Sequence, residues 1–270
     1  MISIIIKGGL GNQLFQIFHV ISYCIKNNLK FVFPKNMRDW DKRKNFWDTI
    51  FKNLDKNTVK TLPEFTKYKE KSFNYLEIPK IEKNIIFDGY FQSYKYFKEN
   101  FENITELIGI EKQKNIIKKQ YNLDYENIIS IHFRIGDYIN LQNHHPIMTL
   151  EYYKDAIKYI IKKTNRDNLS LLVFFELKDK EIVETNIKKL KNIFPNIKFI
   201  SSSNKMKDWE QLLQMSLCNN NIIANSTFSW WGAYFNNNKE KIVCYPNKWF
   251  GKLLSHNNTC DLHPKKWINI

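Results

Sequence analysis

The chain has little arginine and no long hydrophobic run, and each shortage excludes a class of protein. Only four of its 42 basic residues are arginine, although the net charge is +15. A nucleic-acid-binding surface gathers its basic groups on one face, whereas these lysines are spread along the chain, so we predict no nucleic-acid partner. No apolar run approaches the roughly 20 residues that cross a bilayer. We expect no signal peptide, because no charged segment precedes the first apolar run and no small-residue cleavage site follows it. We expect a cytoplasmic protein without a transmembrane segment; peripheral membrane contact and the oligomeric state stay open.

The cysteines are also too dispersed to form a familiar site. No two of them have the C-x-x-C spacing, which argues against a zinc site and against a dithiol redox pair. They stand at Cys24, Cys218, Cys244 and Cys260. We expect reduced thiols in a reducing compartment.

The second half of the chain alternates strand-like and helix-like segments. Short β-branched or aromatic runs predict strands at 127–133, 169–175, 197–200, 221–225 and 241–245. Segments with helical periodicity lie between them, near 150–163, 179–191, 207–218 and 228–236. This alternation predicts an α/β fold with a parallel, doubly wound sheet.

The first half is less regular. The predicted elements are a strand at 2–6, a glycine loop at 8–11, a helix at 12–27, strands at 30–33 and 85–90, and helices from there to about 120. Residues 34–84 carry no clear period and are predicted as loops and short helices. We place a domain boundary near 120–127, which gives an N-terminal domain at 1–124 and a C-terminal domain at 125–270.

Glycine is scarce, with eight residues, yet three of them gather at Gly8, Gly9 and Gly11. A glycine loop between a strand and a helix aims free N–H groups at an anion. It is not a dinucleotide fingerprint, because Leu14 stands where a third glycine belongs, and no Gly-Lys-Ser/Thr follows as in a P-loop. The alternative is a tight turn with Asn12 as the helix cap.

A second cluster, His132-Phe133-Arg134-Ile135-Gly136-Asp137-Tyr138, begins where the strand 127–133 ends. Ligands of open α/β sheets bind beyond the carboxyl ends of strands, so we expect Arg134 to face a ligand. Its planar guanidinium matches phosphate oxygens. Asp137 either orients Arg134 or contacts a substrate hydroxyl; the alternative is a surface ion pair between the two.

The third cluster follows the strand 221–225. Ser226 or Thr227 at the start of the next helix, with its free N–H groups and its dipole, predicts a second anion site. The alternative is that both residues only cap the helix. The paired Trp230 and Trp231 fit helix packing better than a sugar platform.

Together these clusters resemble the α-1,2-fucosyltransferases, glycosyltransferase family 11. The resemblance covers nearly the whole chain: Gly8 to Gln16, Asp88 to Ser93 with Tyr96-Phe97, the Arg134 cluster, Leu150-Glu151-Tyr152-Tyr153, and Met215 to Tyr234. It implies transfer of L-fucose from GDP-β-L-fucose to the 2-hydroxyl of a galactose in a glycan, with inversion and without a metal or other cofactor. It also implies a GT-B-like fold, two Rossmann-type domains facing across a cleft, with the acceptor side in the N-terminal domain and GDP-fucose on the C-terminal one. Another acceptor or linkage, or a non-catalytic nucleotide- or glycan-binding relative, remains the alternative.

The resemblance implies that Arg134 grips the diphosphate, that Asn12 lies near the reacting centre and that His132 contacts the nucleotide. With the candidates from the residue chemistry, the predicted site is as follows. Catalytic roles fall on Arg134, Asn12 and Asp137. Donor or phosphate contacts fall on Gly9, Gly11, His132, Ser226, Thr227 and Ser229. Acceptor contacts fall on Gln13, Tyr138 and Trp230. The fixed donors that must stabilise the leaving β-phosphate are Arg134, the Ser226/Thr227 helix start and the amides of the glycine loop.

Several positions depart from the family pattern. Ile135 replaces a second arginine, and Glu176-Leu177-Lys178-Asp179 replaces Ser-Asp-Asp, so that only Asp179 matches. The catalytic base is not assigned: Asp137 is nearest the phosphate cluster, and Glu151, Asp88 and Asp179 are further candidates. An oxocarbenium-like mechanism that depends little on a base is the alternative. We predict a solvated loop at His144 and His145, with a lid or an acceptor contact as the alternative. We also predict a solvated turn at Asp39-Trp40-Asp41 despite its Asp-x-Asp pattern.

Overall fold

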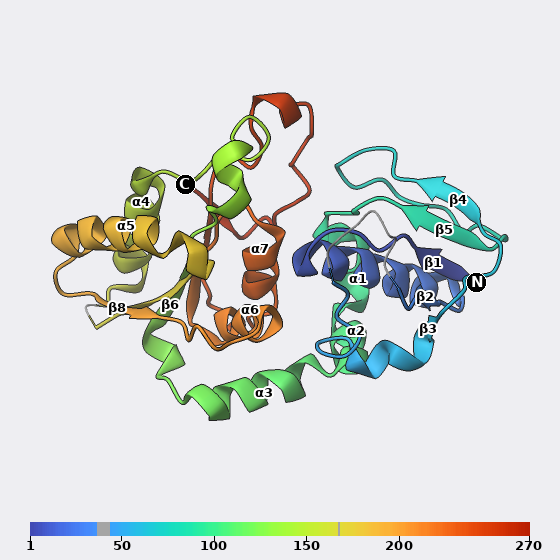
Figure 1. Ribbon diagram of the computed structural model, residues 1–270, viewed down its shortest axis with the longest axis horizontal. Helices are drawn as coiled ribbons and strands as arrows, with labels where there is room; N and C mark the ends of the chain where they lie inside the picture. Colours follow the sequence, from blue (N-terminus) through green and yellow to red (C-terminus); the bar gives the residue numbers. More distant parts are fainter. Residues whose placement is uncertain (37–43, 167) are drawn as a thin grey trace. The chain divides into compact units, whose positions relative to one another are not determined.

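The computed structural model describes residues 1–36, 44–166 and 168–270, and the chain divides into two compact units (Figure 1). Unit 1 comprises Met1–Gln113 and Asn257–Pro264, and unit 2 comprises Lys114–His256 and Lys265–Ile270. The predicted boundary at 124/125 therefore lies after the observed one, and it misses the return of 257–264 to unit 1. The physical reason is that the helix α3, Ile110–Tyr121, runs unbroken across the boundary, so that no linker composition marks it.

Adjacent side chains of α3 belong to different units. Gln113 Nε2 donates to the carbonyl of Ile50 (3.1 Å) in unit 1, whereas Lys114 Nζ donates to the carbonyl of Phe235 (2.9 Å) in unit 2. The late segment is bound to unit 1 through Ser93 Oγ, which donates to the carbonyl of Asp261 (2.7 Å).

Unit 1 is built on a small parallel sheet in the order β1-β5-β4. Its strands are β1 (Ile2–Ile4), β4 (Thr66–Lys69) and β5 (Ile85–Asp88); the short β2 (Phe33–Pro34) and β3 (Thr58–Val59) pair separately. The helices are α1 (Leu10–Asn27) and α2 (Phe101–Ile108). The predicted strand at 30–33 shrinks to β2 and one bridge between Ile2 and Phe31. Fourteen of the 18 residues of α1 are buried, so it is the central helix of this unit.

Unit 2 is a six-stranded parallel sheet in the order β11-β10-β9-β6-β7-β8. The strands are β6 (Ile128–His132), β7 (Ser170–Phe174), β8 (Lys198–Ser201), β9 (Asn220–Ile222), β10 (Val243–Tyr245) and β11 (Ile268–Asn269). The helices are α4 (Leu150–Thr164), α5 (Lys180–Ile193), α6 (Asp208–Leu217) and α7 (Thr227–Tyr234). The predicted alternation of strands and helices is confirmed, and β6 lies between β9 and β7.

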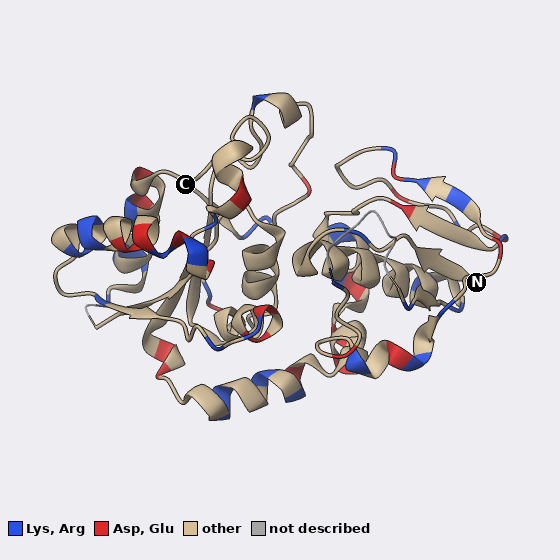
Figure 2. Cartoon of the chain, viewed as in Figure 1, with Lys and Arg blue, Asp and Glu red and all other residues tan. Residues whose placement is uncertain are grey.

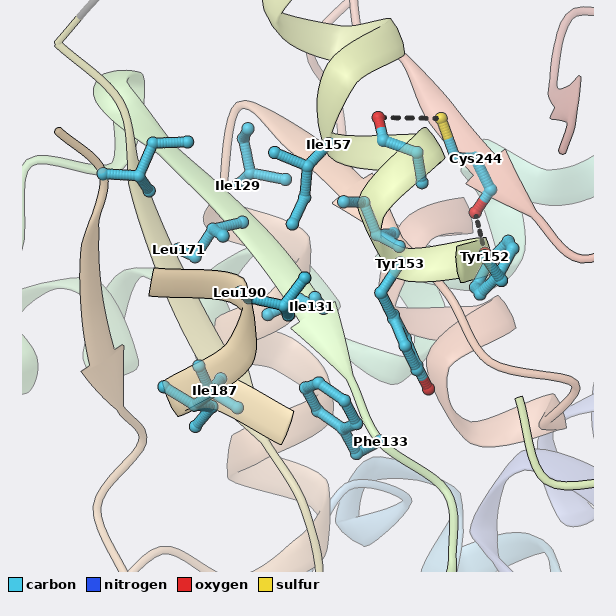
Figure 3. Close-up of a cluster of buried hydrophobic side chains, with 14 of the residues drawn as sticks. Ile129, Ile131, Phe133, Tyr152, Tyr153, Ile157, Leu171, Ile187, Leu190 and Cys244 are labelled. Atoms are coloured by element: carbon cyan, nitrogen blue, oxygen red, sulfur yellow. Dashed lines mark hydrogen bonds between the residues drawn. The ribbon is translucent and has the colours of Figure 1, made fainter. Parts of the chain in front are cut away.

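The main core of unit 2 packs α4 and α5 against the sheet. Figure 3 shows Ile129 and Ile131 of β6 together with Leu171 of β7, facing Ile157 and Leu190 of the helices. Fully burying such an aliphatic side chain contributes roughly 1.5–3 kcal/mol.

Two buried tyrosines tie the first turn of α4 to the carboxyl ends of the strands. Tyr152 Oη donates to the carbonyls of Ile223 (2.5 Å) and Cys244 (3.1 Å), and Tyr153 Oη donates to that of His132 (2.9 Å). These hydrogen bonds within the protein hold the carboxyl ends of the unit 2 strands in place.

Lysines and arginines are interspersed with acidic residues on the helices of both units (Figure 2). Within the described residues, no helix is long and apolar enough to cross a membrane.

Candidate active site

Arg134 emerges in the middle of the unit 2 sheet, two residues after β6 ends. Its guanidinium forms ion pairs with Glu176 through Nη1 and with Asp137 through Nη2. The guanidinium carbon lies 4.9 Å from the centre of the Tyr138 ring, a cation–π distance. The side chain is only 18% exposed. The predicted Arg134–Asp137 pair is therefore present, but it is part of a larger network.

Glu176 is the site residue that the sequence analysis missed. It follows β7, which pairs with β6 residue by residue, and it also pairs with Lys178 (2.8 Å). The signal that could have found it is positional, because the carboxyl ends of neighbouring parallel strands meet at one edge of a sheet.

Gly136 has a backbone that only glycine adopts readily here. Its φ is +37°, and a Cβ added to it would lie 3.2 Å from a Glu176 carboxylate oxygen. Its N–H donates to Asp179 Oδ2 (2.8 Å), and Asp179 is 4% exposed. Asp179 therefore holds the turn that presents Asp137, which makes it a poor base for a substrate.

The start of α7 lies at the end of β9, beside β6. Ser226 is the N-cap, and its Oγ accepts from the N–H of Phe228 (3.3 Å). Ser226 therefore caps the helix. Ser229, 1% exposed, donates through Oγ to the carbonyl of Ser226 (3.4 Å). Thr227 is the first residue of the helix and is partly accessible.

Asn225 joins the two clusters of unit 2. Its carbonyl accepts from Tyr138 Oη (3.1 Å), which links α7 to the Arg134 segment. Its Nδ2 donates to the carbonyls of Pro146 (3.0 Å) and Trp249 (3.2 Å). Its Oδ1 is buried and has no hydrogen-bond partner, so this oxygen is an acceptor still to be satisfied.

His132 is neutral in this environment. The residue is 7% exposed, and burial, followed by the charge of Arg134, lowers the pKa of its imidazole to about 3. Its Nδ1 has no hydrogen-bond partner, and its ring centre is 5.6 Å from that of Phe228. A neutral imidazole offers one donor and one acceptor, which suits a polar ligand group.

The loop at His144 and His145 packs against the site, so the prediction of a solvated loop is wrong for His145. Its ring stacks on Tyr138, with the centres 4.9 Å apart and the planes at 19°. Burial, together with the charges of His144 and Arg134, lowers the pKa of His145, and Asp137 opposes this shift. Tyr138 thus lies between Arg134 and His145.

Trp230 is a core residue. Its side chain is 0% exposed. Its ring packs against those of Tyr234, Trp231 and Trp267, with centres 4.6, 5.2 and 5.4 Å away. Trp230 therefore packs in the core and is not an acceptor contact, in agreement with the helix-packing interpretation of the paired tryptophans.

The glycine loop lies in unit 1, between β1 and α1. Gly8 has a φ of +79°, and the space where a Cβ of Gly9 would stand is open. Gln16 holds the entry to the loop: its Oε1 accepts from Lys7 N–H (3.1 Å) and its Nε2 donates to the Lys7 carbonyl (3.0 Å). Gln13 Nε2 donates to the carbonyls of Gly8 and Lys44, both at 2.9 Å, and Gln13 is 1% exposed. The side chain of Gln13 is thus bound to the protein backbone.

Asn12 is not the helix cap. Gly9 occupies the N-cap and Asn12 lies in the first turn of α1. Its Oδ1 accepts from Gln92 Nε2 (2.9 Å). The neighbouring Leu10, Gly11 and Gln13 are buried, whereas Asn12 is partly accessible. The capping interpretation of Asn12 is therefore wrong.

No three or more His, Cys, Asp or Glu side chains come together as a metal site in the part of the chain that the structure describes. The Asp39-Trp40-Asp41 pattern lies outside the described residues.

Comparison with known proteins places the chain in a family. Residues 38–270 match the model of "Glycosyl transferase family 11". The chain belongs to glycosyltransferase family 11. An O-antigen biosynthesis glycosyltransferase, WbnK, of Escherichia coli is 27% identical over 98% of this chain and 99% of its own length. An alpha-1,2-colitosyltransferase of Escherichia coli is 28% identical over 98% and 97%. A galactoside 2-alpha-L-fucosyltransferase of Caenorhabditis elegans is 26% identical over 90% and 71%.

A solved structure is also similar to this fold. A glycosyl transferase of family 9 from Veillonella parvula superposes with a TM-score of 0.52 over 100% of this chain and 86% of its own, at 10% identity. At this identity the likeness concerns the fold alone. This family 11 glycosyltransferase is thus an α/β protein with a GT-B-like fold and parallel sheets, as predicted.

Proposed function

We propose that this family 11 glycosyltransferase transfers L-fucose from GDP-β-L-fucose to the 2-hydroxyl of a galactose in a glycan, with inversion and without a metal. Family membership supports sugar transfer, and two relatives bear the names of a 2-fucosyltransferase and a 1,2-colitosyltransferase. The observation that carries the proposal is the junction of Arg134 with the start of α7 through the Tyr138–Asn225 hydrogen bond. A guanidinium fork and a helix N-terminus side by side suit a diphosphate.

The reaction exchanges one bond for another. The acceptor O2 bonds to the anomeric carbon while the bond from that carbon to the β-phosphate oxygen breaks, and GDP leaves with the electron pair. The hydroxyl proton passes to a carboxylate or to the departing phosphate. Because negative charge grows on the β-phosphate, donors fixed beforehand lower the barrier most.

Arg134 is the proposed main donor. A hydrogen bond to a charged group contributes roughly 1.5–3 kcal/mol, and about 1.4 kcal/mol changes a rate tenfold. Asp137 and Glu176 hold the guanidinium from both ends, so the fork is aimed before the donor arrives. The diphosphate must then compete with these two carboxylates for the N–H groups.

Several of the other predicted residues keep their roles within this proposal. Thr227 and the N–H groups at the start of α7 contribute further phosphate contacts, and His132 contributes a neutral ring for the nucleotide. Gly9 and Gly11 remain proposed phosphate contacts, and Asn12 a residue near the reacting centre. Asp137, whose side chain is 42% exposed, is the proposed base.

Product analysis tests the proposal. The purified protein is incubated with GDP-β-L-fucose or with GDP-colitose and a β-galactoside, with and without EDTA. Colitose is L-fucose without its 3-hydroxyl, so the two donors separate the activities named for the relatives. We expect an α-1,2-linked fucoside, identified by NMR, in equal yield with chelator. Transfer from GDP-colitose alone would show that the transferred sugar is colitose and not fucose. A linkage other than α-1,2 would show that a different hydroxyl of the acceptor is used. GDP binding with neither transfer nor hydrolysis would indicate a non-catalytic relative.

A further inference from the structure

A carboxylate in unit 1 organises the turn that follows β5. Glu70 accepts hydrogen bonds from two successive backbone N–H groups, those of Tyr90 (2.7 Å) and Phe91 (2.9 Å). We propose that Glu70 is a positioning residue for the transfer reaction, which holds Gln92 and, through Gln92, Asn12 in place. This inference rests on the proposed function, in which Asn12 acts near the reacting centre.

The turn adopts a conformation that needs such support. Phe91 has a φ of +51°, although it is not a glycine, and a left-handed residue of this kind is strained unless its surroundings compensate. Successive N–H groups in a turn form a concavity that binds anions, and the Glu70 carboxylate occupies it. Gly89 permits this approach, because a Cβ there would lie 2.3 Å from that of Glu70.

The turn ends on Asn12. Gln92, the next residue, is 7% exposed and donates from Nε2 to Asn12 Oδ1 (2.9 Å). Gly8 packs against the same side chain, since a Cβ at Gly8 would lie 2.6 Å from Asn12 Nδ2. The orientation of Asn12 is thus set by the loop on one side and by the turn on the other.

The charge of Glu70 changes near neutral pH. Burial raises the pKa of Glu70 to about 7, and the nearby charge of Asp88 adds to this rise. The two amide hydrogen bonds and the charge of Lys7 oppose it. The charge of Glu70 in turn contributes to raising the pKa of Tyr96. Lys7 Nζ in turn bonds to Asp88 (3.0 Å), which Lys67 also approaches (3.5 Å). Protonation of Glu70 weakens its bonds to the N–H groups, because the ionised form is the stronger acceptor.

The first test compares Glu70→Gln with Glu64→Gln, the same change at an exposed site of unit 1. We expect Glu70→Gln to lower kcat at least about tenfold. KM for the donor and Kd for GDP should change less than about threefold, because the lost interaction would stabilise only the transition state. The wild-type kcat should fall below about pH 7 as Glu70 gains a proton, and this decline should be absent from the variant. An unchanged kcat overturns the inference, and so does an equal loss in Glu64→Gln.

The second test asks whether Glu70 acts through Gln92. In a double-mutant cycle with Gln92→Ala, Glu70→Gln should add little further loss, because both changes release Asn12. Fully additive losses overturn the proposed route.

The third test needs no turnover. Amide hydrogen exchange of the peptide 88–94 should be faster in Glu70→Gln than in the wild type, and unchanged in Glu64→Gln. An inactive wild-type protein would overturn the proposed function, whereas unchanged exchange in Glu70→Gln would overturn the role of Glu70.

Discussion

Arg134 and Glu176 form an ion pair between the ends of neighbouring strands, although 42 positions separate them in the chain. Asp137 takes the other end of the same guanidinium. The cationic group proposed to receive the diphosphate is thus already coordinated by two carboxylates. Its affinity for a ligand is set as much by these partners as by Arg134 itself.

Arg134→Lys should keep the fold and lose most of the activity. An ammonium is a point charge that cannot reproduce the two-ended contact of a guanidinium, so we expect kcat/KM to fall about a hundredfold or more, the equivalent of a lost charged hydrogen bond. Steady-state kinetics and thermal melting measure the two effects. Arg166→Lys, at an exposed arginine, serves as the control and should behave as wild type. A normal rate in Arg134→Lys would remove Arg134 from the mechanism.

Glu176→Gln should strengthen GDP binding. The change removes a negative charge that competes with the diphosphate while Asp137 continues to hold the guanidinium, and a gain of about 1.4 kcal/mol corresponds to a tenfold lower Kd. Isothermal titration with GDP at low and high salt measures the effect, with the exposed Glu181→Gln as control. Weaker binding in Glu176→Gln would mean instead that Glu176 is required to aim Arg134.

Asn12→Ala should reduce turnover, whereas Gln16→Ala should reduce stability. Asn12 is partly accessible and does not cap α1, so its loss should reduce kcat more than about tenfold with little change in melting temperature. Gln16 is buried and makes two hydrogen bonds to Lys7, so its loss should cost about 2 kcal/mol of unfolding free energy. Denaturant titration and kinetics on both variants provide the comparison. A large drop in stability with normal turnover in Asn12→Ala would assign it a structural role only.

The protein should lose stability in mild acid because of three buried histidines. Burial lowers the pKa values of His19, His132 and His263 to about 3. The unfolded chain binds these protons near pH 6.5 and the folded chain does not, so the stabilisation is complete above pH 6.5 and falls as the pH drops towards 3. At pH 5 this amounts to about 2 kcal/mol for each histidine. Glu70 has the opposite effect on the free energy of unfolding, since its pKa is raised to about 7 and the folded chain binds its proton more tightly. This gain from one group does not offset the loss from three histidines.

Urea denaturation between pH 5 and pH 8 measures this dependence. His19→Phe is the informative variant, because the ring stacks on Phe91 with centres 4.0 Å apart and neither nitrogen has a hydrogen-bond partner. It should reduce the net slope of unfolding free energy against pH by about half, because Glu70 already cancels about one of the three histidines, whereas the exposed His256→Phe should leave it unchanged. Equal slopes in wild type and His19→Phe would show that His19 is not the source.

The sequence predicts the fold of unit 2 well because strand and helix periods alternate there without interruption. It also places Arg134 and the start of α7 at strand ends, since a buried run followed by polar residues marks such an end. It does not reveal Glu176 or Glu70, because both act through partners that only the pairing of strands brings near. The role of Gln13 was equally hidden, since an amide in a motif does not show whether it is exposed, whereas the pairing of Trp230 with Trp231 already favoured a core role.

The return of 257–264 to unit 1 makes the two units inseparable as contiguous pieces. A fragment that stops at residue 113 lacks the carbonyl of Asp261 that accepts from Ser93. One that stops at residue 256 also loses the edge strand β11, which pairs with β10. Dissecting this protein into separately expressed halves therefore requires a permuted or split chain in which the late segment is supplied in trans.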